Sequence, residues 1–144
     1  MTQTVRSVWI PPGEWQDAWN GSIVTGPRHA TVDRSFAQIP MWHRRGGLVV
    51  LSSDPGLRLV MQDWRELTLE VFPAASARVL RRSVFSLGSG SETQITLRQA
   101  AVSLVLSVVP GVDDTARAWL LRLHLLPGQR ALAASVDAAP ATFQ

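Results

Sequence analysis

Stretches in which apolar and polar residues alternate dominate the second half of this chain, and they narrow its fold more than any other feature. Four segments show the alternation: 66–72, 92–98, 102–108 and 119–125. In the first of them, Leu67, Leu69 and Val71 point to one side of an extended strand, while polar residues point to the other. The pattern predicts strands with one face turned to a core.

The other three segments predict inward faces in the same way. These faces hold Ile95 and Leu97, then Val102, Leu104, Leu106 and Val108, and finally Trp119, Leu121, Leu123 and Leu125. Turn-forming residues such as Gly, Pro, Asp and Ser separate the segments. Only 74–80 has good helix propensity, and it is too short to form a helix alone. The sequence therefore predicts an all-β fold, an antiparallel β-sandwich.

Length and composition limit the architecture further. With 144 residues, of which 46% are hydrophobic, the chain can form one domain or two small β-modules around buried cores. A (β/α)₈ barrel needs roughly 250 residues, so none fits. The absence of cysteine excludes disulfides and Cys-based metal sites.

The charge distribution argues against nucleic acid as a partner. The net charge of +3 comes from 14 arginines and no lysine, and most arginines stand singly among acidic residues. No apolar run approaches the roughly 20 residues of a membrane span, so we expect no membrane partner. The N-terminus lacks the pattern of a signal peptide, which favours the cytoplasm.

Two linked motifs occupy the first third of the chain. Residues 8–21 read VWIPPGEWQDAWNG, and residues 39–50 read IPMWHRRGGLVV. They resemble the segment that follows the catalytic barrel in family 31 glycoside hydrolases, the α-glucosidase and α-xylosidase group. In that family the first motif reads roughly V-[YW]-[LI]-P-x-G-x-W-x-D-x-W-x-G, and an I-P-[LM]-[FW]-x-R-x-G-[GS]-[LIV] motif follows.

The resemblance implies two β-modules outside the catalytic centre. Residues 1–53 would form a proximal β-domain that packs on the barrel, and residues 54–144 a distal β-sandwich with a frayed tail at 137–144. The barrel itself would precede Met1, and we expect the chain to be a piece of the longer enzyme. The resemblance weakens after about residue 75.

Tryptophans cluster in the same third of the chain, at positions 9, 15, 19 and 42. Trp15, Trp19 and Trp42 are candidates for contacts with sugar, because an indole face packs against the apolar face of a pyranose. The alternative, which we favour, is that they pack in a core or against the barrel, with Trp15 and Trp19 beside a Pro-Pro-Gly turn.

Asp17 is the one acidic residue of the motif that invites a catalytic role. Retaining glycosidases need two carboxylates about 5 Å apart, and Asp17 has no evident partner. We therefore expect it to accept hydrogen bonds from the adjacent turn or from an arginine.

His43, Arg44 and Arg45 form the other candidate contact with the barrel, followed by Gly46 and Gly47, which permit a close backbone approach. An edge strand that carries solvated charges explains this segment equally well. The three histidines are far apart in sequence without ligand spacing, so we expect no metal site and no cofactor.

These observations predict a non-catalytic C-terminal accessory β-domain of a retaining α-glycoside hydrolase, with no catalytic residue of its own. Its partner would be the enzyme's own (β/α)₈ barrel, and α-linked oligosaccharides are a further candidate ligand. A carbohydrate-binding β-sandwich module and a stand-alone protein-interaction β-domain are the alternatives. Self-association of the isolated domain is expected if an apolar face is left uncovered.

Overall fold

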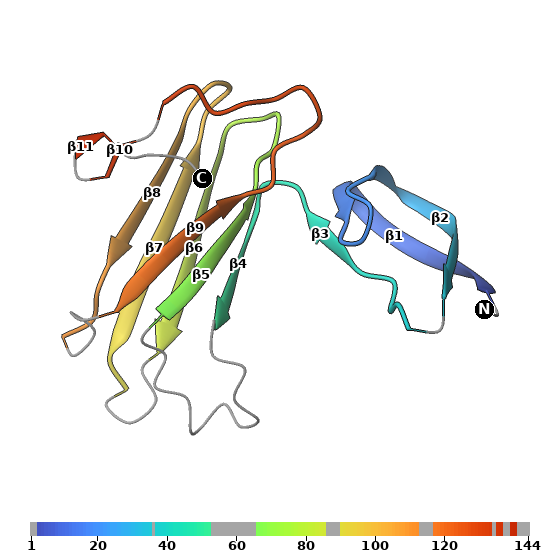
Figure 1. Ribbon diagram of the computed structural model, residues 1–144, viewed down its shortest axis with the longest axis horizontal. Coiled ribbons are helices and arrows are strands. Elements are labelled where there is room, and N and C mark those ends of the chain that lie inside the picture. The colour runs from blue at the N-terminus through green and yellow to red at the C-terminus, as the bar shows by residue number, and fades with distance from the viewer. Residues whose placement is uncertain are drawn as a thin grey trace.

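The computed structural model describes residues 3–35, 37–52, 66–85, 90–112, 117–133, 135–136 and 139–140. Every regular element within these ranges is a β-strand, which confirms the all-β prediction (Figure 1). No helix of sufficient length and apolarity to cross a bilayer occurs within the same ranges. The predicted division at 53/54 lies within residues 53–65, which fall outside these ranges.

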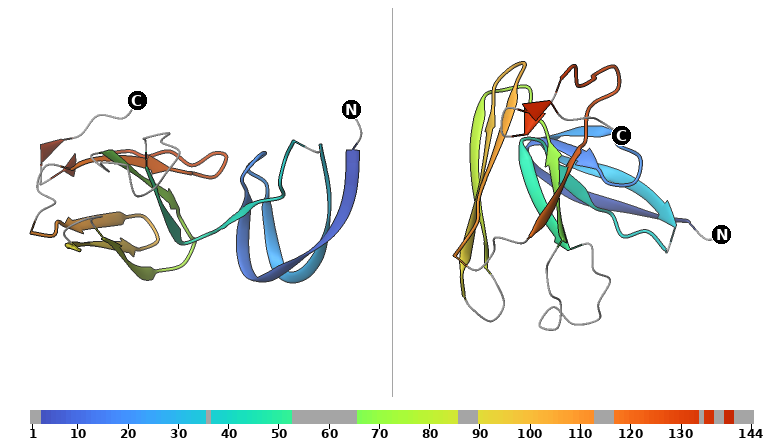
Figure 2. Two further views of the ribbon diagram at one scale, coloured as in Figure 1. Left: turned by 90° about the horizontal axis from the view of Figure 1, so that it is seen from below. Right: turned by 60° about the vertical axis from the view of Figure 1, so that its left-hand side comes forward.

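The first three strands form a sheet of their own, which we call the curled sheet. It has the order β2-β1-β3, from β1 (Gln3–Asp17), β2 (Ile23–Ser35) and β3 (Trp42–Arg44), and all its pairings are antiparallel. The long β1–β2 hairpin bends into a deep curve beside the rest of the molecule (Figure 2).

The predicted Pro-Pro-Gly turn does not reverse the chain. Pro11 and Pro12 lie inside β1, where the register with β2 shifts between Ile10 and Gly13. Prolines cannot donate to a ladder, so they are tolerated where a bulge interrupts it, and Gly13 supplies the positive φ of 120°. The motif therefore bends a strand instead of ending it.

Two three-stranded sheets form the sandwich (Figures 1 and 2). One has the order β4-β5-β9, from β4 (Gly47–Ser52), β5 (Glu66–Phe72) and β9 (Ala118–Leu123). The other has the order β6-β7-β8, from β6 (Arg78–Phe85), β7 (Glu92–Gln99) and β8 (Leu104–Val109). All pairings are antiparallel except β5 with β9, which run parallel.

The pairing of β4 and a short ribbon near the C-terminus complete the fold. β4 pairs with β5, so residues 47–52 hydrogen-bond to the sandwich and not to the curled sheet. Near the C-terminus, β10 (Ser135–Val136) pairs with β11 (Ala139–Pro140) in a two-stranded ribbon.

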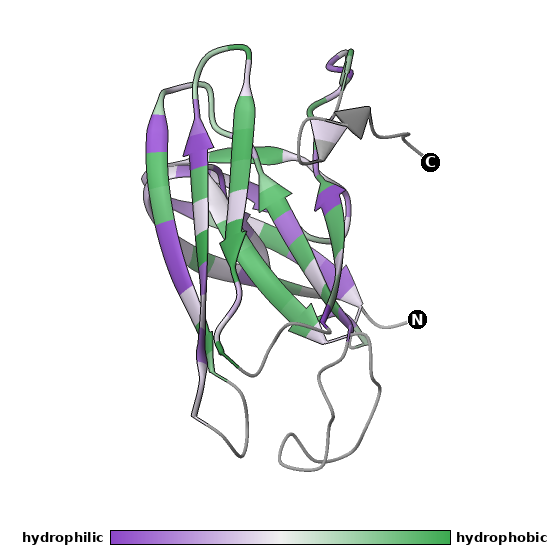
Figure 3. Cartoon of the chain, turned by 90° about the vertical axis from the view of Figure 1, so that its left-hand side faces the viewer, coloured by the Kyte–Doolittle hydropathy of each residue, from purple (hydrophilic) through white to green (hydrophobic). Residues whose placement is uncertain are grey.

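The core of the sandwich lies between its two sheets. It consists of buried residues from β4, β5, β6 and β7: Leu48, Leu67, Leu69, Val71, Val84, Ile95 and Leu97. Apolar and polar bands alternate along these strands (Figure 3). The inward faces predicted for β5 and β7 are thus confirmed.

Three expectations of the alternation were wrong. β5 is buried on both faces, because Thr68 and Glu70 are 6% and 8% exposed like their apolar neighbours. Val102 precedes β8 and is 99% exposed, and Leu121 on the edge strand β9 is 44% exposed. Alternation reports which residues share a face, but the neighbouring elements decide whether that face is covered.

Candidate functional site: the joint between the curled sheet and the sandwich

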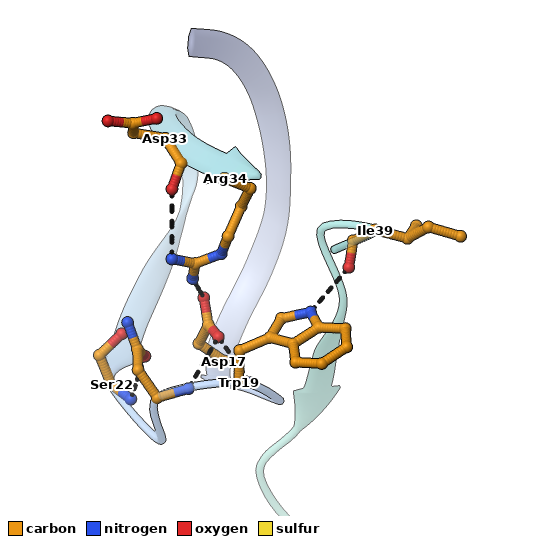
Figure 4. Close-up of polar contacts among 7 residues, drawn as sticks. Asp17, Trp19, Ser22, Asp33, Arg34 and Ile39 are labelled. Carbon is orange, nitrogen blue, oxygen red and sulfur yellow. Dashed lines mark hydrogen bonds and ion pairs between the residues drawn. The ribbon is translucent and has the colours of Figure 1, made fainter. Parts of the chain in front are cut away.

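Asp17 is the buried acid at the end of β1, and its carboxylate holds the β1–β2 turn together (Figure 4). Oδ1 accepts hydrogen bonds from the backbone N–H groups of Trp19 at 2.8 Å and Asn20 at 3.2 Å. Oδ2 accepts from Nη2 of Arg34 on β2. The expected structural role of Asp17, between a turn and an arginine, is confirmed.

The candidate tryptophans of the curled sheet differ in their surroundings. The half-buried Trp15 donates from Nε1 to the carbonyl of Pro11 at 2.9 Å, and the guanidinium of Arg44 lies 5.9 Å from its ring centroid. Trp19 is 48% exposed and donates to the carbonyl of Ile39 at 2.8 Å (Figure 4).

Of the other two tryptophans in this third of the chain, the candidate Trp42 is less exposed than Trp9. Trp42 is half-buried opposite Asp17 in the β1–β3 pairing. Trp9, which was not among the candidates, is 53% exposed and packs against His29 with ring centroids 5.2 Å apart. Its position in β1 gave no sign of this, because only the curl of the sheet decides which face is covered.

A stack of three rings joins the curled sheet to the sandwich. His43 of β3 and His124, which follows β9, lie on opposite sides of Phe72, the last residue of β5. Both histidine rings lie 4.3 Å from the phenyl centroid, at interplanar angles of 10° and 11°. Phe72 is only 2% exposed, so the two imidazoles close its faces.

Arg45 stabilises the same region through hydrogen bonds. We call this region, where β1 and β3 meet Phe72 and His124, the joint. The guanidinium Nη1 of Arg45 donates to Oε1 of Gln16 on β1 and to the carbonyl of His124, both at 3.0 Å. Its backbone N–H donates to the carbonyl of Glu14 at 2.8 Å. Arg45 is 5% exposed, and it thereby ties β1 to the end of β9.

The next residue, Gly46, is needed for its small size and backbone conformation. Its φ is +76°, and a Cβ at this position would lie 2.7 Å from Nη1 of Arg78. The close approach expected at this glycine is confirmed.

The carboxylate of Glu70 lies beside the joint and interacts with two basic side chains. Glu70 of β5 accepts from Nη1 of Arg122 at 2.7 Å, and its other oxygen lies 3.5 Å from Nε2 of His124. Burial lowers the pKa of His43, the charge of Glu70 opposes that shift, and the charge of His124 adds to it. Burial also lowers the pKa of Arg45, and nearby Glu14 opposes the effect.

The joint therefore unites His43, Arg44 and Arg45 with Trp15 and Trp42, as one connected region of β1 and β3. Trp19 lies at the β1–β2 turn instead. The sequence analysis did not identify Gln16, Phe72 or His124 as part of this region. Phe72 and His124 lie about 30 and 80 residues after His43, so no local pattern links them to it. Their contacts arise only when the sandwich closes.

These contacts hold two structural units together, and the two buried acids of the region are both paired with arginines. Asp17 faces Arg34, and Glu70 faces Arg122. No group of three or more His, Asp or Glu side chains able to hold a metal ion occurs in the described part of the chain.

Comparison with solved structures identifies the fold. The dextranase of glycoside hydrolase family 31 (GH31) from Flavobacterium johnsoniae, in complex with isomaltotriose, superposes with a TM-score of 0.75 at 15% identity. The match covers 96% of this chain and 18% of that one. A glucosidase II alpha subunit matches with a TM-score of 0.58 and 18% identity, over 77% of this chain and 13% of its own.

A further match is an uncharacterised Listeria monocytogenes protein, with a TM-score of 0.57, 22% identity and 73% of this chain covered. No protein-family model matches the sequence, and no curated protein matches it. The chain thus has the fold of a small β-segment of GH31 enzymes, and it spans less than a fifth of the dextranase.

Proposed function

We propose that this chain is a non-catalytic accessory β-domain of a retaining α-glycoside hydrolase. The observation that carries the proposal is the asymmetry of the structural match, which covers 96% of this chain and 18% of the dextranase. The two sequence motifs of residues 8–50 support the same family independently of the coordinates.

The charged groups of the joint support a non-catalytic role. A retaining mechanism needs two carboxylates about 5 Å apart, one free to attack and one free to transfer a proton. Asp17 is buried, caps a turn and pairs with Arg34, so it can do neither. In the proposed enzyme, both catalytic carboxylates belong to a (β/α)₈ barrel outside this chain.

The surface of the curled sheet suits a partner of that kind. Its strands and the segment before β3 expose several large apolar side chains: Val5, Trp9, Trp19, Ile39 and Met41. Large exposed apolar side chains are common at interfaces. In the proposed arrangement, the barrel covers this surface, and the joint connects the curled sheet to the sandwich.

Two measurements test the accessory role. The gene upstream of the Met1 codon is expected to encode a barrel in the same reading frame, and a stop codon with a ribosome-binding site directly ahead would contradict the proposal. The isolated chain is expected to release no nitrophenol from nitrophenyl α-glucosides or α-xylosides. Release above a heat-inactivated control would mean that the chain carries its own catalytic site.

A sugar titration separates this role from that of a carbohydrate-binding module. Trp15 and Trp42 are half-buried, and Trp15 is covered by Arg44, so tryptophan fluorescence should not change with maltooligosaccharides. Saturable quenching would favour the carbohydrate-binding module, with the exposed Trp9 and Trp19 as its contact residues.

A further inference from the structure

A groove of about 370 Å³ runs where β3 and the two edge strands β4 and β6 come together. Its lining residues include Arg78 and Arg82 of β6, Leu48 and Val49 of β4, and His43 and Arg44 of β3. We call it the basic groove. Because its lining residues belong to β3 as well as to β4 and β6, it lies where the curled sheet meets the sandwich.

The groove holds positive charge without an acidic counterpart. None of its lining residues is Asp or Glu. Arg44 lies over Trp15, Arg78 donates to the carbonyl of Arg45 at 3.3 Å, and Arg82 donates to the carbonyl of Arg81 at 3.0 Å.

Within the described ranges, no carboxylate pairs with any of these three arginines. Arg34 and Arg122 do have such partners, Asp17 and Glu70. Three guanidiniums that line one concave surface attract an anionic partner and orient it.

The backbone around the groove favours an extended peptide as that partner. β4 pairs only with β5, and β6 pairs only with β7, so each presents one unpaired edge in the described structure. Such edges accept an added strand through main-chain hydrogen bonds. A polysaccharide carries no amide ladder and could use only the charges.

The side chains of β6 specify the sequence of the added strand. Arg78, Leu80 and Arg82 alternate on the face of β6 that turns toward β4, and Leu80 packs against the core. Four residues of strand span about 13 Å, so Arg78 and Arg82 are spaced along β6 like residues i and i+4 of a paired strand. The complement is acidic at both ends and apolar in the middle.

We propose that the basic groove binds an extended acidic segment of a partner protein, with carboxylates at positions i and i+4 and an apolar residue at i+2. The carboxylates pair with Arg78 and Arg82, and the apolar side chain contacts Leu80. Arg44, which also lines the groove, adds to the attraction for the acidic segment.

The test is fluorescence anisotropy of a labelled peptide, Thr-Thr-Glu-Thr-Val-Thr-Glu-Thr-Thr, titrated with the 144-residue chain. Binding should weaken by about tenfold in the variant Arg78→Gln/Arg82→Gln, since two charge-assisted contacts are lost. The matched control is Arg81→Gln, a neighbour in β6 that does not line the groove, and it should change binding by less than about twofold. Binding by the parent chain should also fall between about 0.05 and about 0.5 M NaCl.

A second peptide, in which Gln replaces both Glu residues, gives the same comparison without altering the protein. It answers the question even if the double variant does not fold. No binding of the acidic peptide, equal binding of both peptides, or equal effects of the groove and control variants would each overturn the proposal. Binding of polygalacturonate but not of the acidic peptide would overturn it in favour of an acidic glycan. The isolated chain is used throughout, so the result is independent of the accessory role proposed above.

Discussion

Removing the carboxylate of Asp17 should destabilise the curled sheet more than any other polar substitution in the β1–β2 hairpin. The carboxylate is 5% exposed and accepts from two backbone N–H groups and from Arg34, whose side chain is 19% exposed. Breaking a buried pair costs 3–5 kcal/mol, and solvent near Arg34 reduces that cost, so Asp17→Ala should lower the free energy of unfolding by about 3 kcal/mol.

A conservative variant divides this cost between the hydrogen bonds of the turn and the contact with Arg34. Asp17→Asn keeps an oxygen for the backbone N–H groups of Trp19 and Asn20, but it removes both the charge and the acceptor opposite Arg34, because an amide N–H₂ group takes the place of Oδ2. Its expected cost is about half as large, near 1.5 kcal/mol. Arg34→Met added to Asp17→Asn should then cost less than the sum of the single changes, because the two residues form one contact.

The assay is urea unfolding followed by tryptophan fluorescence. Four of the six tryptophans lie in the first 42 residues, so the signal reports mainly on the curled sheet. Asp33→Asn is the matched control, since Asp33 is an exposed acid beside Arg34, and it should stay within about 0.5 kcal/mol of the parent. If Asp17→Ala also stayed within about 0.5 kcal/mol, with an unchanged urea dependence, the structural role of Asp17 would be refuted.

Three further predictions concern the joint and the core. Because burial lowers the pKa of His43, a falling pH protonates this residue in the unfolded chain before it does so in the folded chain. The free energy of unfolding should therefore be highest above pH ~6.5 and decrease as the pH drops below that value. Urea midpoints at several pH values check this, and His43→Gln should weaken the dependence. Arg45→Met should cost about 3 kcal/mol and speed proteolysis at the joint, because the carbonyl of His124 loses a buried donor; an unchanged cleavage rate would refute it. Leu69→Ala should cost between 2 and 5 kcal/mol in thermal or urea unfolding, and a loss under about 1 kcal/mol would contradict its place in the core.

The strands of the sandwich were predictable because their pattern is local. Ile95 and Leu97 alternate with polar residues on β7, and the structure buries both of them. The role of Asp17 was predictable for a similar reason, since the N–H groups that it caps belong to the next three residues. In both cases the residues that decide the outcome lie within one strand or one turn.

The burial of Glu70 could not be predicted from the same pattern. Its alternation with Leu69 and Val71 indicates a solvent-facing residue, yet Arg122 and His124 cover it from more than 50 residues away. Phe72 shows the same effect, because its two faces are covered by His43 and His124, which lie far from it in sequence on either side.

Local alternation, turn chemistry and the two motifs were thus enough to specify an all-β chain and to point to the enzymes whose fold it shares. The joint and the basic groove required the folded molecule. The alternation along a strand indicates which side chains share a face, whereas the order of the strands determines which element packs against that face. Here that order places β4 and β6 at two edges beside β3, and brings His124 onto Phe72, through contacts that no periodicity along the chain encodes.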